Sequence, residues 1–566
     1  MHVGSFNLCE LPAGFKGSFH QAVTKHIANR LHLAPVFSRK LVFMPLDLGH
    51  PIWVEADTVD IGFHIRRADS TKKGAAPMTL AEAHKLCAQL HGELIDRNFP
   101  LWEFYVFDRI QLPGAQGRPQ GGKVVAGFFS KIHHAALDGK GGVMLANAML
   151  DLTPVPREVT PPDPARRRKL ASDLKLGKMI GSVFSSSLGQ IVKAAKALPL
   201  AASTLGSTLA RQSISPATGA RAKMPIRLAP RTPFNAGIAS SRVFVTATVP
   251  LAECKAMGKA VGGSFNDIVL WICSTALRNY LVQHHSLPKK SLVAAMPVSL
   301  RQNDAAGDGP DATHLGNQVS MSLVELGTHL AHPLKRMNAI MASTGKVKTS
   351  MQSLKGLLPT DYPSLLAPWL VGGVAKMALS AYGTSGMASR LPMVANLVIS
   401  NVPGPPVPLY LAGAQFLSFH PLSIIIHGLA LNITIQTYAG KVDFGIVADK
   451  QALPHARDLA KAIEAAFAQA QTLMTTAPRA TRPSTGVVAP VPVLAPEASV
   501  KTRKTAVTQE TKSAESGKTS LAKARKRADT VPIPNNPAFN ASSHGKSAFK
   551  TVKIIKAVPR KNSAKA

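Results

Sequence analysis

Residues 391–440 contain no Lys, Arg, Asp or Glu, and no other feature restricts the possible folds of this chain so strongly. A run of this length without charge must be largely covered, because a large apolar surface is unfavourable in water. The run is interrupted at 401–406 by Asn-Val-Pro-Gly-Pro-Pro, and proline and glycine at that density break a membrane-spanning helix. We therefore predict buried strands joined by a rigid turn, and no membrane span.

Strand and helix patterns occur on both sides of a basic middle segment, which indicates an α/β fold in two parts. A chain of 566 residues is also too long for one compact core. We predict two lobes, 1–152 and 232–476, joined by a connector over 153–231 and followed by a tail over 477–566. Apolar periodicity predicts strands over 104–107, 124–132, 242–249, 292–298, 432–437 and 442–447, and helices over 80–94, 267–283 and 454–474.

The positive charge of the chain is concentrated in two segments. The whole chain has 66 Lys and Arg against 31 Asp and Glu, a formal net charge of +35. Residues 477–566 contain 18 of these cations and 4 of the anions, and residues 164–231 contain 13 cations and a single Asp. The remainder is only mildly basic, so we do not expect the lobes to bind nucleic acid over their whole surface.

The tail over 477–566 is rich in Ala, Lys, Pro, Ser and Thr, and its only aromatic residues are Phe539 and Phe549. Such a composition buries too little apolar area to offset the entropy lost on ordering, so we predict that the tail is disordered. It is either a simple solvated extension or an electrostatic tether to anionic lipid or nucleic acid.

The connector contains a mostly apolar and small-residue stretch over 179–210, in which Lys193 and Lys196 are embedded. Its larger apolar residues recur at roughly helical spacing. The stretch is either an amphipathic helix in a membrane interface or a link that packs on the protein.

The cysteine content indicates a reducing compartment. Four cysteines, at positions 9, 87, 254 and 273, are scattered and too few for a disulfide framework. The first residues also lack the charged, apolar and small-residue succession of a secretion signal. We therefore expect a cytoplasmic protein.

The clearest chemical signal is the segment 131–139, Lys-Ile-His-His-Ala-Ala-Leu-Asp-Gly, which closes the predicted strand 124–132 ahead of a helix starting near Gly141. Adjacent strand residues point to opposite faces, so His133 and His134 cannot readily chelate one metal ion, and we predict no metal site. The same alternation places His134 on the apolar face of the strand.

An imidazole titrates near neutral pH and suits a general base, so His134 is the candidate for that role. Asp138 follows just past the strand, where a carboxylate can brace the turn through an ion pair. Gly139 permits the backbone geometry of a chain reversal. An isolated pair of histidines is more often two satisfied core side chains. The full spacing HHxxxDG at a strand-to-helix junction instead favours a catalytic site.

The HHxxxDG spacing resembles the signature of the CoA-dependent acyltransferase superfamily, which includes chloramphenicol acetyltransferase and the condensation domains of peptide synthetases. Other stretches are similar to bacterial wax ester synthase/diacylglycerol acyltransferases, in the right order, and extend the resemblance over roughly residues 1–474. These stretches are Pro100-Leu101-Trp102, Phe265-Asn266-Asp267, Met296-Pro297-Val298-Ser299-Leu300-Arg301, Gly316-Asn317 and Asn401-Val402-Pro403-Gly404-Pro405. Members of that family usually have a further segment ahead of the counterpart of residues 1–4, so we expect either a misassigned start or a missing N-terminal element.

The resemblance implies a two-lobed α/β fold like that of chloramphenicol acetyltransferase, with a central tunnel entered by acyl-CoA from one side and by a lipid alcohol from the other. It implies that His134 deprotonates the hydroxyl of diacylglycerol or of a long-chain alcohol, which then attacks the thioester without an acyl-enzyme. Acyl-CoA is the co-substrate, and no metal or redox cofactor is required. Because the substrates are lipids, we expect peripheral association with the inner face of the membrane or with lipid inclusions.

The resemblance also gives roles to the residues around His134. His133 supports it, and Asp138 is structural, with Arg301 as its ion-pair partner. Gly139 is structural as well.

Residues of the second lobe and of the loops are expected to bind substrate or to shape the fold. Asn266 either caps the helix that begins beside it or, with Asp267, orients groups near the site. The remaining motif residues are structural, as packing residues (Pro100, Leu101, Trp102) or as residues of a crossover turn (Asn401, Pro403, Gly404).

Two other functions remain open at this point. The chain could be an acyltransferase of the same superfamily that uses another acceptor, such as a polyketide or peptidyl hydroxyl. It could also be a lipid-inclusion or nucleoid-binding protein in which the lobes are catalytically idle, although the intact HHxxxDG motif speaks against idleness.

Overall fold

The computed structural model describes residues 2–43, 51–56, 58–69, 76–114, 122–137, 139–161, 228–299, 319–354 and 393–476. All of these residues fall within one compact unit, Met1–Thr481. Asp138, Arg301 and the Gly316-Asn317 pair lie outside the described residues, as do 162–227 and the whole tail. The expectations of a disordered tail and of an amphipathic stretch over 179–210 therefore stay predictions.

The first sheet contains the strands β1 (His2–Glu10), β4 (Ile65–Arg67), β5 (Met78–Thr79), β6 (Trp102–Gln111), β7 (Val124–His133), β12 (Tyr410–Leu411), β13 (Ala414–Phe416) and β14 (His420–Leu422). Their order is β12-β13-β1-β7-β6-β4, with β14 also paired to β1 and β5 to β6. β7 is antiparallel to both of its neighbours, β1 and β6. This pairing along both edges fixes where the last residue of β7 lies.

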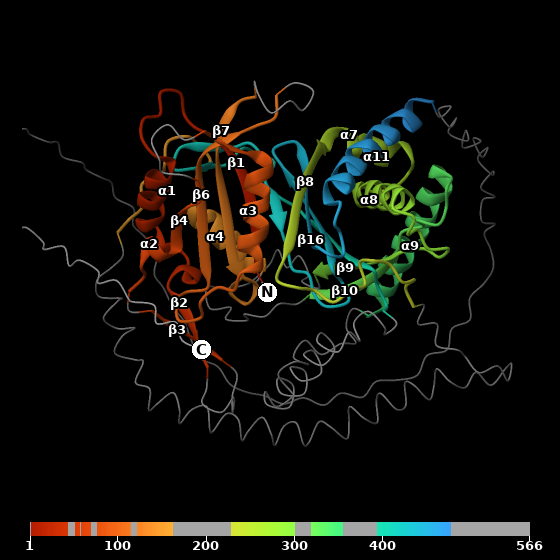
Figure 1. Ribbon diagram of the computed structural model, residues 1–566, viewed down its shortest axis with the longest axis horizontal. Helices are drawn as coiled ribbons and strands as arrows, with labels where there is room; N and C mark the ends of the chain where they lie inside the picture. Colours follow the sequence, from red (N-terminus) through yellow and green to blue (C-terminus); the bar gives the residue numbers. More distant parts are fainter. Residues whose placement is uncertain are drawn as a thin grey trace, which may run out of the picture. The chain divides into compact units, whose positions relative to one another are not determined.

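Helices accompany this sheet as α1 (Phe19–Ala28), α2 (Ile61–His64), α3 (Leu80–Gly92) and α4 (Gly139–Met149), and a small separate sheet pairs β2 (Arg39–Val42) with β3 (Ile52–Glu55) (Figure 1). α3 begins with a capping box. The Thr79 hydroxyl accepts a hydrogen bond from the backbone N–H of Glu82, and the Glu82 carboxylate accepts one from the N–H of Thr79. The predicted helix over 80–94 is confirmed, ending two residues earlier.

The second sheet has the order β10-β9-β11-β15-β16-β8, with β8 (Arg242–Pro250), β9 (Val293–Ser299), β10 (Val319–Glu325), β11 (Leu397–Val402), β15 (Leu431–Tyr438) and β16 (Lys441–Asp449). Its core lies against α7 (Leu251–Ala260), α8 (Phe265–Gln283), α9 (Pro333–Leu354) and α11 (Ala456–Thr476). The hairpin predicted at 432–447 is confirmed. Its turn residues, Ala439 and Gly440, have φ values of 43° and 81°, as a two-residue hairpin of the favoured hand requires.

A crossover links the two sheets after β11. The chain leaves the second sheet there and then contributes β12, β13 and β14 to the first. Residues 410–422, which the sequence placed in the lobe 232–476, therefore belong to the first sheet. This is a correction to the predicted boundaries, and its cause is the pairing of β13 and β14 with β1.

Gly404 lies in this crossover, where only a glycine fits. A Cβ at this position would meet the carbonyl oxygen of Thr437 at 2.0 Å, and the Gly404 N–H donates to the Thr437 hydroxyl at 3.0 Å. The backbone of the crossover is thereby held directly against β15. Pro403, just before it, is exposed.

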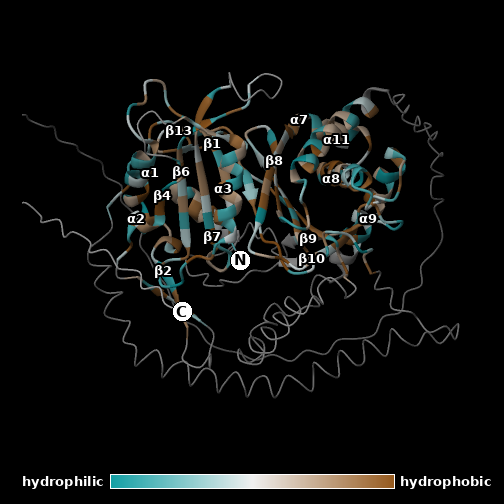
Figure 2. Cartoon of the chain, in the orientation of Figure 1, coloured by the Kyte–Doolittle hydropathy of each residue, from teal (hydrophilic) through white to brown (hydrophobic). Residues whose placement is uncertain are grey.

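The first sheet is buried on both faces. Phe128 and Ile132 of β7 pack on the face covered by α1, whereas Phe129 packs on the other face, with Phe244 of β8. Figure 2 shows the hydrophobic residues along β8. Because both faces are covered, a reactive side chain at the end of β7 becomes accessible only where the strand stops.

No single helix of the described residues has the length and composition of a membrane span. α7 and α8 reach both only as a pair, with a bend of 101° between them.

Candidate active site

The HHxxxDG motif lies at the carboxyl end of β7. His133 is the last residue of the strand, and its Cα is in register with that of His2 on β1. Its backbone N–H donates to the carbonyl oxygen of Leu101 at 2.9 Å. Backbone groups on both sides therefore hold His133 in place.

His134 does not continue the strand. It is the first residue of a short 3₁₀ helix, His134–Ala136. The prediction that strand alternation sets its direction is therefore wrong. The alternation stops at His133, and the turn orients the next side chain.

The His134 side chain is accessible. It is partly exposed, and its ring forms no hydrogen bond with any other residue in the described part of the chain. Such an imidazole can still accept a proton from a bound substrate.

His133 has a different environment. Burial, together with the positive charge of Arg97, lowers the pKa of His133 to about 4. Its Nδ1 accepts a hydrogen bond from the N–H of Ala135 at 3.2 Å, and its ring meets that of His2 edge-on with centroids 6.0 Å apart. The His133 ring therefore bonds to the turn that follows it.

The described residues contain no candidate metal site. Within those ranges, no group of three or more His, Cys, Asp or Glu could hold a metal ion. The four cysteines are all free and buried.

The Pro100-Leu101-Trp102 stretch supports the motif from β6. All three residues are buried. Leu101 accepts the hydrogen bond from His133, and the Trp102 indole N–H donates to the carbonyl oxygen of Phe37 at 3.1 Å. The His64 ring stacks on Trp102 with centroids 4.1 Å apart. The stretch therefore acts by packing and by holding the strand end.

A buried ion pair lies directly beneath the motif, and the sequence reasoning missed it. The Lys131 ammonium donates to the Glu103 carboxylate at 2.9 Å, with the two side chains 1% and 6% exposed. The Tyr105 hydroxyl donates to the same carboxylate at 2.8 Å. The available signal was a lysine inside the otherwise apolar run of β7.

Two motifs of the second half meet through asparagines. The Asn401 amide donates to the side-chain oxygen of Asn266 at 3.3 Å. This contact joins the end of β11 to the start of α8. The alternative in which Asn266 caps α8 is wrong, because Ser264 is the N-cap and Asn266 is the second helical residue.

Asp267 is engaged in structural hydrogen bonds. Its carboxylate accepts from the Ser264 N–H and hydroxyl, at 2.8 and 2.6 Å, and from the Thr344 hydroxyl at 2.7 Å. Burial acts to raise the pKa of the Asp267 carboxyl, but these hydrogen bonds hold it below its ordinary value. The geometry therefore shows Asp267 stabilising the start of α8.

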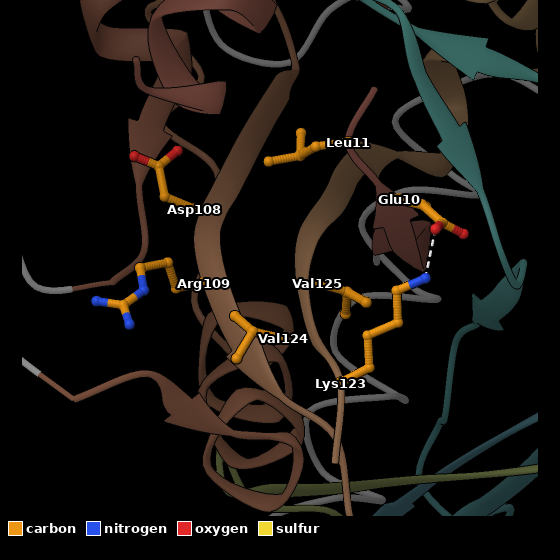
Figure 3. Close-up of a pocket in the computed structure, with 7 residues that line it drawn as sticks. All are labelled: Glu10, Leu11, Asp108, Arg109, Lys123, Val124 and Val125. Atoms are coloured by element: carbon orange, nitrogen blue, oxygen red, sulfur yellow. Dashed lines mark hydrogen bonds and ion pairs between the residues drawn. The ribbon is translucent and has the colours of Figure 1, made fainter. Parts of the chain in front are cut away.

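A surface pocket lies at the opposite end of β7 from the motif. It is lined by residues that include Asp108, Val124 and the Glu10–Lys123 ion pair shown in Figure 3. β7 separates it from His133 by roughly 30 Å, given the rise of a strand. The pocket is therefore not part of the candidate site.

Buried histidines next to the site make the stability of the fold dependent on pH. Burial, with Arg242 and Lys131 nearby, lowers the pKa of His91 to about 4, and burial lowers that of His2 to about 3. Both folded-state pKa values lie below the unfolded value of about 6.5. At pH values between the folded and unfolded pKa, the unfolded chain therefore binds more protons than the folded chain. Stability should be complete above pH 6.5 and fall as the pH falls toward 4.

Urea unfolding at pH 7.5 and pH 5 measures this loss, to which His91 contributes about 1.4 kcal/mol per pH unit. His91→Gln should flatten the dependence by that amount. Equal slopes for the two proteins would contradict the assignment.

Two protein families match this chain. The family described as "Wax ester synthase/diacylglycerol acyltransferase catalytic domain" matches residues 1–269, and that described as "WS/DGAT C-terminal domain" matches residues 315–471. A Mycobacterium tuberculosis (strain ATCC 25618 / H37Rv) protein named "Probable diacyglycerol O-acyltransferase" is 32% identical over 476 residues, which cover 82% of this chain and 94% of that protein. The O-acyltransferase WSD of Acinetobacter baylyi is 30% identical over 468 residues, 82% and 91% of the two chains.

A solved structure has the same fold. The wax ester synthase/diacylglycerol acyltransferase from Marinobacter aquaeolei VT8 superposes with a TM-score of 0.54 at 24% identity, covering 84% of this chain and 95% of that one. The predicted fold class is confirmed by this likeness.

Proposed function

The chain belongs to the wax ester synthase/diacylglycerol acyltransferase family, and we propose that His134 is the general base of its reaction. The protein is an acyl-CoA-dependent O-acyltransferase that esterifies diacylglycerol or a long-chain alcohol, forming triacylglycerol or wax ester. The observation that carries the proposal for His134 is its place on a short turn at the end of β7, partly exposed and without a hydrogen bond to another described residue.

The reaction needs only one proton acceptor from the protein. The acceptor hydroxyl gives its proton to His134 as its oxygen attacks the thioester carbonyl, forming the new C–O bond. The tetrahedral intermediate then collapses, the C–S bond breaks, and the proton on His134 passes to the departing sulfur to give the free thiol of CoA. Holding both substrates at the turn makes the attack effectively unimolecular.

Product analysis with the purified full chain tests the activity. Palmitoyl-CoA is supplied with either a diacylglycerol or hexadecanol, and release of free CoA thiol is followed alongside ester formation. We expect thiol and ester in equal amounts, and the ratio of the two esters gives the acceptor preference. Thiol release with no ester from either acceptor would contradict the function and would leave another hydroxyl acceptor as the alternative.

Asp138 and Arg301 are proposed to form an ion pair that braces the turn after His134. Both lie outside the described residues, and the support is their match to the family motifs. A double-mutant cycle tests the pair, because strictly additive losses would reject it.

We also propose that the enzyme binds peripherally to the cytoplasmic face of a membrane or to lipid inclusions. The support is the lipid nature of its substrates and the concentration of cations at 164–231 and 477–566. Exposed cations near an anionic surface contribute about 1 kcal/mol each and are screened by salt, whereas insertion of apolar side chains is not.

Deleting 477–566 is therefore expected to remove most of the salt-sensitive part of binding to anionic liposomes. Phe184→Asp is expected to weaken the binding that survives in high salt. Co-sedimentation across a salt series measures both. An unchanged salt dependence after the deletion would reject the tether, and intact high-salt binding of Phe184→Asp would make 179–210 a simple connector.

A further inference from the structure

We propose that His133 is a positioning residue, which in its neutral Nε2–H form caps the turn that carries His134. The inference rests on the proposed role of His134 as the base. It gives the two adjacent histidines different roles. His133 would act through the backbone of the next three residues rather than through the reacting atoms.

The geometry at His133 is that of an N-cap. Its φ and ψ are −70° and 133°, which is extended backbone, and the helical residues begin immediately after it. Its Nδ1 accepts from the Ala135 N–H at 3.2 Å, the bond that a capping side chain makes to an otherwise unpaired N–H in the first turn. Among the described residues, one other backbone bond holds this turn, from the Leu137 N–H to the His134 carbonyl oxygen at 3.2 Å. The cap therefore adds a side-chain hydrogen bond to a very short turn.

The capping ring is itself held in place. The His133 ring meets the His2 ring edge-on. His2 is fixed in turn, because its Nδ1 lies 3.2 Å from the carbonyl oxygen of His91 and its Nε2 accepts from the Ile95 N–H at 3.4 Å. The backbone N–H of His133 donates to the Leu101 carbonyl oxygen, which fixes the Cα from which the ring extends.

The cap defines which nitrogen of His133 carries the proton. The Ala135 N–H donates, so Nδ1 must be the unprotonated nitrogen and the ring hydrogen must be on Nε2. A doubly protonated ring would lose this bond. It would also place a positive charge beside His134 and make His134 a weaker proton acceptor. Burial and the charge of Arg97 lower the pKa of His133 to about 4, so its ring is neutral near pH 7.

Four substitutions separate a capping role from simple packing. The oxygen of asparagine can take the place of Nδ1 and cap, whereas glutamine has the same amide but reaches past that position. Serine caps as well, and alanine cannot. We expect His133→Ala and His133→Gln to lower kcat by roughly 5- to 30-fold with little change in the KM for acyl-CoA. His133→Asn and His133→Ser should stay within about 3-fold of the unsubstituted enzyme.

A fifth variant gives a readout that packing alone would not move. His133→Asp caps the turn but adds a negative charge beside His134, which favours the protonated form of the base. The acid limb of its kcat–pH profile should move to higher pH, while that of His133→Asn stays in place.

The inference is overturned if asparagine and glutamine give equal kcat values, or if the profile of His133→Asp does not move. The Asn and Gln variants differ by one methylene, so this comparison holds even if His133→Ala folds poorly. His134→Ala, run in parallel, tests the base itself. Normal turnover of His134→Ala would reject the role of His134 as the base. If His134→Ala loses turnover but His133→Asn and His133→Gln have equal kcat values, only the capping role of His133 is rejected.

Discussion

Replacing His134 with alanine is expected to lower kcat for ester formation by about 10²–10⁴-fold, which is the usual contribution of a general base. The loss should occur with both acceptors, because the proton transfer is the same for diacylglycerol and for an alcohol. The fold should survive. The side chain is partly exposed and bonds to no other described residue, so its removal leaves no buried partner unsatisfied. Product formation under saturating palmitoyl-CoA measures the loss.

A matched variant separates loss of the base from general damage. His332 is exposed just before α9, far along the chain from the motif, and His332→Ala should keep both the melting temperature and kcat. Near-normal turnover in a well-folded His134→Ala would remove the histidine from the mechanism. A large fall in its melting temperature would show that the residue is structural.

Local signals in the sequence predicted the helices and hairpins well. The apolar pattern over 267–283 places α8, which begins two residues earlier, and Ala439-Gly440 between two apolar runs places the β15–β16 hairpin. The strands β12 to β14 could not be found in this way. They contain two or three residues each, and such a length shows no alternation. Their place in the first sheet depends on contacts with β1, about 400 residues earlier in the chain.

The residues of the candidate site could also be predicted only where their signal is local in the sequence. HHxxxDG is visible because its spacing is local. The direction of His134 was predicted wrongly because the sequence does not show where β7 ends and the turn begins. The Asn266–Asn401 contact joins residues 135 positions apart, and one sequence has no local signal for it. Glu103 and Lys131 meet only because the register of β6 and β7 sets them opposite each other, and register is a property of the assembled sheet.

Glu103→Gln is expected to destabilise the protein by about 3–5 kcal/mol at pH 7, which is the cost of removing one partner from a buried ion pair. Glutamine keeps the shape and an acceptor for the Tyr105 hydroxyl, so the change removes little besides the charge. Lys131, 1% exposed, is then left buried and unpaired. Arg66, the other cation near Glu103, is 39% exposed and remains solvated. Urea unfolding measures the free energy.

The pH dependence and a second substitution show that the stranded ammonium is the cause. Burial already lowers the pKa of Lys131, against the effect of Glu103, and without the carboxylate the folded-state pKa falls further. The unfolded chain then binds more protons up to about pH 10.5, so the stability of Glu103→Gln should rise between pH 7 and pH 9.5 relative to the unsubstituted protein. Adding Lys131→Met should recover most of the loss, because a buried pair replaced by apolar groups costs little. Glu55→Gln, which breaks the exposed Arg39–Glu55 pair, is the control and should cost less than about 1 kcal/mol. If Glu103→Gln costs no more than this control, Lys131 does not depend on the carboxylate, and the end of β7 is held by its backbone bonds alone.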